Sequence, residues 1–101
     1  MGRNIVDMPW RYAHVTEDTV VTTSPVILHS ITINHPDDGQ NTPEAVVYNG
    51  VDATGTAIAT IDLTGGHVFP NTLFYDIRLN DGLFIDIVGT AANVDLTVMY
   101  Y

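Results

Sequence analysis

The last third of the chain alternates apolar and polar residues in three successive runs. The runs cover residues 73–79, 83–88 and 94–101, and turn-forming residues at 80–82 and 89–93 separate them. Strict alternation places successive side chains on opposite faces of a sheet. The pattern therefore predicts three strands, each with an apolar inner face and a more polar outer face.

Shorter β-prone segments precede this ladder, and no segment of helical length shows a 3.6-residue period. The expected strands cover residues 10–15, 20–23, 26–34, 44–49 and 56–63. Short strands separated by turn signals are typical of a sandwich or barrel. The chain is predicted to be all-β, an antiparallel, jelly-roll-like β-sandwich of about seven or eight short strands. Its 101 residues suit one domain, with residues 20–101 as the sandwich and residues 1–19 as an N-terminal arm or edge segment.

The clearest strand of the first half is residues 26–34. Unbroken alternation there puts His29 on the same face as Ile27, Ile31 and Ile33. His29 is accordingly expected at the edge of the core, with its hydrogen bonds satisfied.

The turn at Asn80-Asp81-Gly82 predicts how the last strands pair. A three-residue hairpin loop sets Leu79 opposite Leu83, and Gly82 can take the left-handed conformation of a bulge. Pairing the third strand with the second then aligns three carboxylates on the outer face, those of Asp76, Asp86 and Asp95.

Such a row of carboxylates has two interpretations. Hard cations such as Ca²⁺ take several oxygen ligands, but they usually draw on loop carbonyls that flat strands do not supply. Solvated or partner-facing aspartates are the favoured interpretation, and no metal site is predicted. The Asp37-Asp38-Gly39 loop is a weaker cation candidate that is better explained as a turn.

Apolar side chains on the outer faces of these strands are candidates for contact with a partner. Phe74, Phe84, Met99 and Tyr101 fall at positions that the alternation turns away from the core. Exposed apolar patches mark interfaces, although a second sheet or the N-terminal segment could cover them. Trp10 and Tyr12 near the N-terminus could insert into a neighbouring subunit or cap this domain. The predicted partner-interface residues are Trp10, Tyr12, Phe74, Phe84, Met99 and Tyr101.

Charge and residue types narrow the functional classes. Twelve acidic residues face three arginines, which gives a formal net charge of -9 and disfavours nucleic acid and anionic membranes as partners. No apolar run approaches the ~18 residues that cross a bilayer. The four histidines do not pair at metal-ligand spacing, no serine lies in a G-x-S-x-G context, and no glycine-rich phosphate loop is present. The chain is expected to have no cofactor and not to be an enzyme.

Three stretches carry a resemblance to a known group of proteins. They are SPVILHSITIN (residues 24–34), VVYNGVDATGTAIATIDL (residues 46–63) and the segment from residue 73 to 101. The shared features are a strand with a central HSI, a Y-x-G-x-x-A-T-G-T tip, a polar turn followed by G-L, and a final strand that begins G-T-A-A-N-V. Their order and spacing over residues 20–101 resemble small virion proteins of tailed bacteriophages.

The resemblance implies a structural role on the exterior of a virus particle. The chain would be a capsid decoration or cement protein that binds the assembled shell through the major capsid protein or another virion protein, as a homotrimer. The alternative is a receptor- or glycan-binding knob or adaptor on a tail or fibre, with Tyr48 and residues 49–56 as the binding edge. An enzyme or a Ca²⁺-dependent module is the third and least favoured interpretation.

Overall fold

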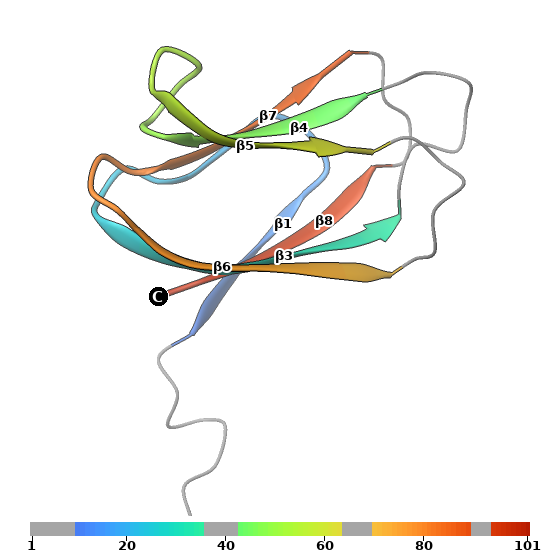
Figure 1. Cartoon of the computed structure of the whole chain (residues 1–101), viewed down its shortest axis with the longest axis horizontal. Helices are drawn as coiled ribbons and strands as arrows, with labels where there is room; N and C mark the ends of the chain where they lie inside the picture. The colour runs from blue at the N-terminus through green and yellow to red at the C-terminus, as the bar shows by residue number, and fades with distance from the viewer. Residues whose placement is uncertain (1–9, 36–42, 64–69, 90–93) are drawn as a thin grey trace, which may run out of the picture.

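The computed structural model describes residues 10–35, 43–63, 70–89 and 94–101, which form strands and turns (Figure 1). Within these ranges there are eight strands and no helix, so no helix that could span a membrane is found there. The strands are β1 (Arg11–Val15), β2 (Thr19–Thr22), β3 (Val26–His35), β4 (Glu44–Asn49), β5 (Thr56–Asp62), β6 (Asn71–Leu79), β7 (Leu83–Val88) and β8 (Asp95–Tyr100).

The strands form two four-stranded antiparallel sheets that face each other. The first sheet has the order β1-β8-β3-β6, and the second has the order β2-β7-β4-β5 (Figure 1). The pairs β1–β8, β2–β7, β3–β6 and β4–β5 are nested along the chain. This winding is that of a jelly roll, in which an antiparallel ribbon folds over on itself. The prediction of an all-β antiparallel sandwich of about eight strands is confirmed.

The core lies between the two sheets and follows the alternation of the last strands. Several residues at predicted inner positions are fully buried, namely Leu79, Leu83, Ile85, Leu96 and Val98. Tyr75 is partly buried against this core. Ile77 is 39% exposed next to the irregular Asp76, so the predicted inner position is wrong there. Residues that alternate with them point outward and keep contact with solvent. Burying an aliphatic side chain of this size stabilises the fold by roughly 1.5–3 kcal/mol, so the alternation itself selects the inner faces.

The predicted hairpin at residues 80–82 is wrong. β6 belongs to the first sheet and β7 to the second, so this turn crosses from one sheet to the other. Leu79 and Leu83 therefore enter one core from opposite sides. Gly82 does adopt a positive φ of 120°, and its carbonyl accepts a hydrogen bond of 3.4 Å from the N–H of Gly50. The turn is thus held against the β4–β5 tip.

The predicted face of His29 is also wrong, because β3 changes phase in its middle. The pairing of β3 with both neighbours shifts register between Leu28 and Ser30. Leu28 and Ile31 are both fully buried, although they are three positions apart and unbroken alternation would place them on opposite faces. The bulge turns His29 to the outside of the sandwich, where it does not share a face with Ile31.

Part of the predicted N-terminal segment lies in the sandwich. Residues 11–15 form β1, the edge strand of the first sheet, and pair with β8 from Arg11↔Tyr100 to Val15↔Leu96. Val15 is fully buried. Residues 1–9 lie outside the described part of the chain.

Candidate functional site

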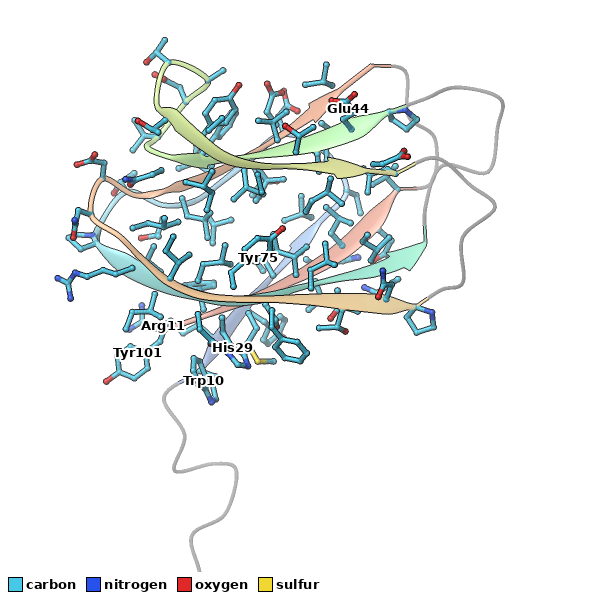
Figure 2. The ribbon with its side chains drawn as sticks, viewed as in Figure 1. Trp10, Arg11, His29, Glu44, Tyr75 and Tyr101 are labelled. Carbon is cyan, nitrogen blue, oxygen red and sulfur yellow. The ribbon has the colours of Figure 1, made fainter. Side chains whose placement is uncertain are left out.

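The candidate site is the outer face of the first sheet, around His29. Figure 2 shows Trp10, His29 and Tyr101 together on the side of this sheet that faces away from the second sheet. This surface, the aromatic face, consists of Trp10, Tyr12, His29, Phe74, Met99 and Tyr101. It combines β1, the centre of the sheet and the edge strand β6.

Two irregularities in adjacent strands build the centre of the aromatic face. Between Leu28 and Ser30, the partner residues on β6 run from Ile77 to Phe74, so β6 carries one residue more than β3 there. Asp76 lies in this stretch with a φ of 49°, a left-handed conformation that Asp tolerates better than most residues. From there its Oδ1 lies 2.5 Å from Nδ1 of His29. The bulge thus aims both side chains at each other across the strands.

Aromatic rings surround the His29 imidazole. The indole of Trp10 stacks on it with a centroid distance of 4.5 Å and an interplanar angle of 28°. Phe74 approaches edge-on at 5.5 Å, and Tyr101 meets Trp10 edge-on at 6.0 Å. These are the favourable stacked and T-shaped geometries of aromatic pairs. The rings therefore hold one another in fixed positions on the surface.

Five of the six predicted interface residues lie on the aromatic face. Tyr12 is 74% exposed, Phe74 68% and Tyr101 54%, which is high for such large side chains. Trp10 and Met99 are half-buried, and Met99 lies directly opposite Tyr12 in the register. Trp10 stacks on His29 of its own sandwich, and its insertion into a neighbouring subunit stays a prediction.

Phe84 does not join this group, contrary to the predicted cluster with Phe74, Met99 and Tyr101. It lies on β7 in the second sheet, where its ring centroid is 6.0 Å from that of Tyr48. The cause is the turn at residues 80–82, which changes sheets and sends the outward side chains of β6 and β7 to opposite sides of the molecule.

A polar network occupies the other end of the same sheet. Nε2 of His14 lies 2.8 Å from Oδ1 of Asp95. The Asn34 amide donates to Asp95 at 3.1 Å and to the Thr97 hydroxyl at 2.8 Å. Asp76 and Asp95 thus each have a histidine partner on the first sheet, and the aromatic face has a polar border.

The predicted row of carboxylates does not form. Asp76 and Asp95 lie in the first sheet on strands that are not neighbours, and Asp86 lies in the second sheet. In the described ranges, no group of three or more His, Cys, Asp or Glu side chains is arranged to hold a metal ion. The Asp37-Asp38-Gly39 loop lies outside those ranges, as does His67.

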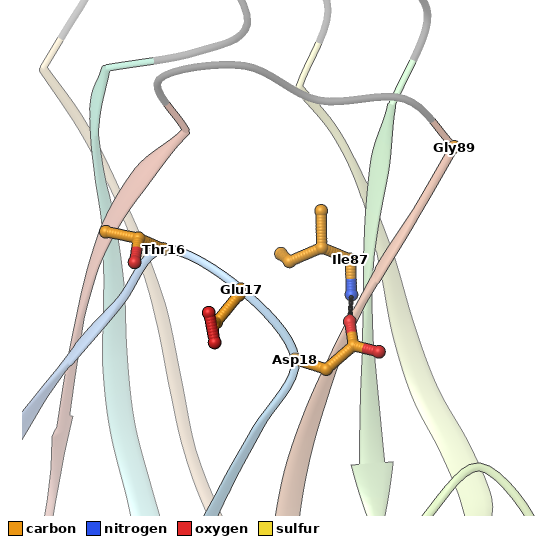
Figure 3. A pocket seen from close by; sticks show the side chains of 5 residues that line it. All are labelled: Thr16, Glu17, Asp18, Ile87 and Gly89. Atoms are coloured by element: carbon orange, nitrogen blue, oxygen red, sulfur yellow. Dashed lines mark hydrogen bonds between the residues drawn. The ribbon is translucent and has the colours of Figure 1, made fainter.

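Asp86 instead interacts with Asp18 beside a shallow depression of the surface. Thr16, Glu17, Asp18, Ile87 and Gly89 line this depression (Figure 3). Oδ1 of Asp18 accepts a hydrogen bond of 2.7 Å from the Ile87 N–H. Burial raises the pKa of Asp86, and the charge of Asp18 and a hydrogen bond with it add to this effect. The Asp18 and Asp86 carboxylates therefore lie close enough to repel each other when both are charged.

The tip predicted as a binding edge for a receptor or glycan is tightly organised. Asp52 Oδ1 accepts hydrogen bonds from the N–H and the hydroxyl of Thr54, and these bonds lower the pKa of Asp52. Asn49 Oδ1 accepts a hydrogen bond of 2.9 Å from the Asp81 N–H. Tyr48 does not sit at the tip, because it lies beside Phe84 on the second sheet.

Sequence patterns did not single out His29 and Asp76 as a pair. They are 47 positions apart, and unbroken alternation assigned them to different faces. The extra residue that separates the buried Leu28 and Ile31 becomes visible only in the structure, because Ile27, Ile31 and Ile33 fit unbroken alternation in the sequence.

Comparison of the chain with protein-family models, with curated proteins and with solved structures finds no match. The functional proposal below therefore combines the fold and the surfaces described above with the resemblance seen in the sequence.

Proposed function

We propose that the protein is a non-enzymatic structural protein of a virus particle, a decoration or cement protein that binds an assembled protein shell through its aromatic face. The observation that carries the proposal is the group of exposed rings on one side of the first sheet. Contiguous exposed aromatic side chains surrounded by polar groups are typical of protein interfaces. The resemblance to small virion proteins of bacteriophages supplies the kind of partner.

The energetics favour a protein partner. Each aromatic side chain buries about 150–250 Å² when it is covered. Covering Tyr12, Phe74 and Tyr101, which are the most exposed rings, would therefore contribute several hundred Å² to an interface. Phe74 packs edge-on against His29 and Tyr101 packs edge-on against Trp10 in the unbound chain, so these two rings lose less side-chain entropy on docking.

The protein would bind the outside of the shell as a homotrimer, which is the oligomeric state that the resemblance implies. Tyr12 of β1 lies opposite Met99 within the aromatic face, so contacts of the first strand and of the rest of the face would be made together. Contacts of this kind lock neighbouring shell subunits without any chemical step.

Binding to shells assembled without this chain tests the proposal. The double variant Tyr12→Ser/Phe74→Ser removes two exposed rings, whereas Val51→Ser removes a side chain that is 43% exposed at the β4–β5 tip. The double variant should co-sediment with shells at least tenfold more weakly than the native chain, because each lost aromatic contact is worth about 1 kcal/mol or more. Val51→Ser should bind as the native chain does. Equal binding by all three proteins, or none by the native chain, would contradict the proposal.

A receptor- or glycan-binding knob on a tail or fibre is the alternative function. It draws support from the ordered tip, where Asn49, Asp52 and Thr54 fix the backbone with side-chain hydrogen bonds. A glycan array probed with the native chain and with Val51→Ser, which removes an exposed side chain of the tip, separates the two functions. Glycan binding that is lost in Val51→Ser favours the alternative, and absence of glycan binding by the native chain removes it.

A further inference from the structure

Charge is distributed unequally between the two sheets. Every arginine and histidine within the eight strands belongs to the first sheet, namely Arg11, His14, His29, His35 and Arg78. The strands of the second sheet carry Glu44, Asp62 and Asp86 and contain no arginine, lysine or histidine. The second sheet is thus uniformly acidic, whereas the acidic groups of the first sheet have basic neighbours.

An apolar row crosses the outer face of the second sheet. Val20 of β2 lies opposite Phe84 of β7, and Phe84 lies opposite Tyr48 of β4. The Tyr48 and Phe84 rings are in contact at a centroid distance of 6.0 Å, and Val20 is 46% exposed. The neighbouring strands β2, β7 and β4 therefore place three apolar or aromatic side chains side by side across the outer face of the sheet.

Carboxylates lie next to this row. Asp86 is the next outward residue after Phe84 on β7, and Glu44 lies at the start of β4 with an exposed side chain. Asp18 adds a further carboxylate beside Asp86, and its charge raises the pKa of Asp86 together with the larger effect of burial. A cation brought against this surface would relieve that repulsion.

We propose that the outer face of the second sheet is a second interaction surface, which receives a protein segment that combines arginine or lysine with apolar side chains. Charge complementarity identifies this occupant, because an acidic surface with an apolar centre favours a basic partner with an apolar centre. A second copy of the same face is a poor occupant, since a two-fold contact would set carboxylates against carboxylates. The inference goes beyond the role of the aromatic face and does not depend on it. With both faces in use, the sandwich would join two partners.

A defined probe tests this surface in the full chain. The probe is a six-residue peptide that alternates arginine with valine, and its control replaces each arginine with uncharged citrulline. Titration followed by amide NMR shifts should move signals of β4 and β7, around Tyr48, Phe84 and Asp86, and should leave Phe74 and Asp76 unmoved. Binding should weaken as salt is added, because exposed charges are screened.

Charge-matched variants make the test specific. Glu44→Gln/Asp86→Asn removes two charges from the surface, and it should weaken peptide binding about three- to tenfold, since each exposed pair is worth about 0.2–1 kcal/mol. Asp52→Asn/Asp81→Asn removes two charges at the tips and should leave binding within about twofold of native. Tyr12→Ser/Phe74→Ser should also bind the peptide normally, which separates this test from that of shell binding.

Three results would overturn the inference. The first is equal binding of the citrulline peptide, and the second is equal weakening by both charge-matched pairs. The third is dilution-dependent shifts of the same amides in the chain alone, because they would show that a second copy occupies the face.

Discussion

Asp76 Oδ1 lies 2.5 Å from Nδ1 of His29, and Asp76 makes this contact from a left-handed backbone conformation with a φ of 49°. Within the described ranges, no other residue except glycine has a positive φ. Such a conformation persists where surrounding contacts determine it, and it is found preferentially at functional sites. Here it occurs where the aromatic rings gather, which connects the irregular backbone to the surface proposed to bind.

At Asp76, a glycine variant should be more stable than an alanine variant, which is the reverse of the usual order of stability in a strand. Asp76→Ala keeps the unfavourable φ and loses the bond to His29, whereas Asp76→Gly loses the bond but relieves the backbone. The glycine variant should be more stable than the alanine variant by about 1 kcal/mol, from the cost of left-handed conformations in residues with a Cβ. Urea unfolding followed by the fluorescence of Trp10, the single tryptophan, measures both free energies.

The matched control lies on the same strand. Thr72 is exposed and its φ is not positive, so Thr72→Gly should be less stable than Thr72→Ala, in the ordinary order. If the Asp76 pair followed the same order as the Thr72 pair, the strained bulge would not be a feature of the folded protein.

Gly82 should tolerate no side chain. Its φ is 120°, and an added Cβ would lie 2.8 Å from the carbonyl oxygen of Thr22 and 3.0 Å from that of Gly50. Gly82→Ala should lower the free energy of unfolding by at least about 1–3 kcal/mol, from backbone strain alone. Asp81→Ala is the control, because the hydrogen bond to Asn49 uses the Asp81 backbone N–H. Thermal unfolding that ranks the two variants equally would contradict the sheet-crossing turn.

The strands could be predicted from the sequence, but their partners could not. Alternation in residues 83–88 fixes which side chains of β7 face inward, and it does so whether β7 pairs with β6 or crosses to the other sheet. The choice depends on long-range contacts, such as the pairing of β7 with β2 and β4 and the hydrogen bond between Gly82 and Gly50, which carry no local pattern. A hairpin and a sheet-crossing turn of the same length therefore look alike in the sequence.

The residues of the candidate site were only partly predictable, because alternation gives the face of a side chain but not the sheet to which its strand belongs. Alternation correctly turned Phe74 and Met99 outward, but the sheet assignment decided that Phe84 lies on the opposite side. His29 was misplaced because a bulge moves one residue across faces and depends on both neighbouring strands. The charge difference between the sheets becomes visible only when the strand order is known.

Removing the charge of Asp86 should stabilise the protein in a pH-dependent way. The folded pKa of Asp86 is raised, so its favourable contribution is complete below the unfolded pKa and is lost as the pH rises through the folded pKa. Asp86→Asn should therefore gain stability relative to the native chain as the pH rises above about 4, by up to about 1 kcal/mol. Urea unfolding across this range gives the difference, and a difference that is constant with pH would rule out the crowded carboxylates.

Tyr75 should affect stability only in alkaline solution. Burial raises the pKa of its phenol, so the stability that it contributes is complete below the unfolded pKa of about 10 and is lost as the pH rises through the folded pKa. Tyr75→Phe should therefore retain more stability than the native chain above about pH 10. The exposed Tyr12 gives the control, since Tyr12→Phe should follow the native curve. Identical alkaline curves for Tyr75→Phe and the native chain would contradict the inward position of Tyr75.

An electron cryomicroscopy map of shells that carry this protein would show directly which surface binds the shell. We expect the first sheet to lie against the shell, with Trp10, Tyr12 and Phe74 covered by shell subunits. The same map would show the second sheet turned away from the shell and open to a basic partner. A map in which the aromatic face points to solvent, while another surface contacts the shell, would contradict binding through the aromatic face.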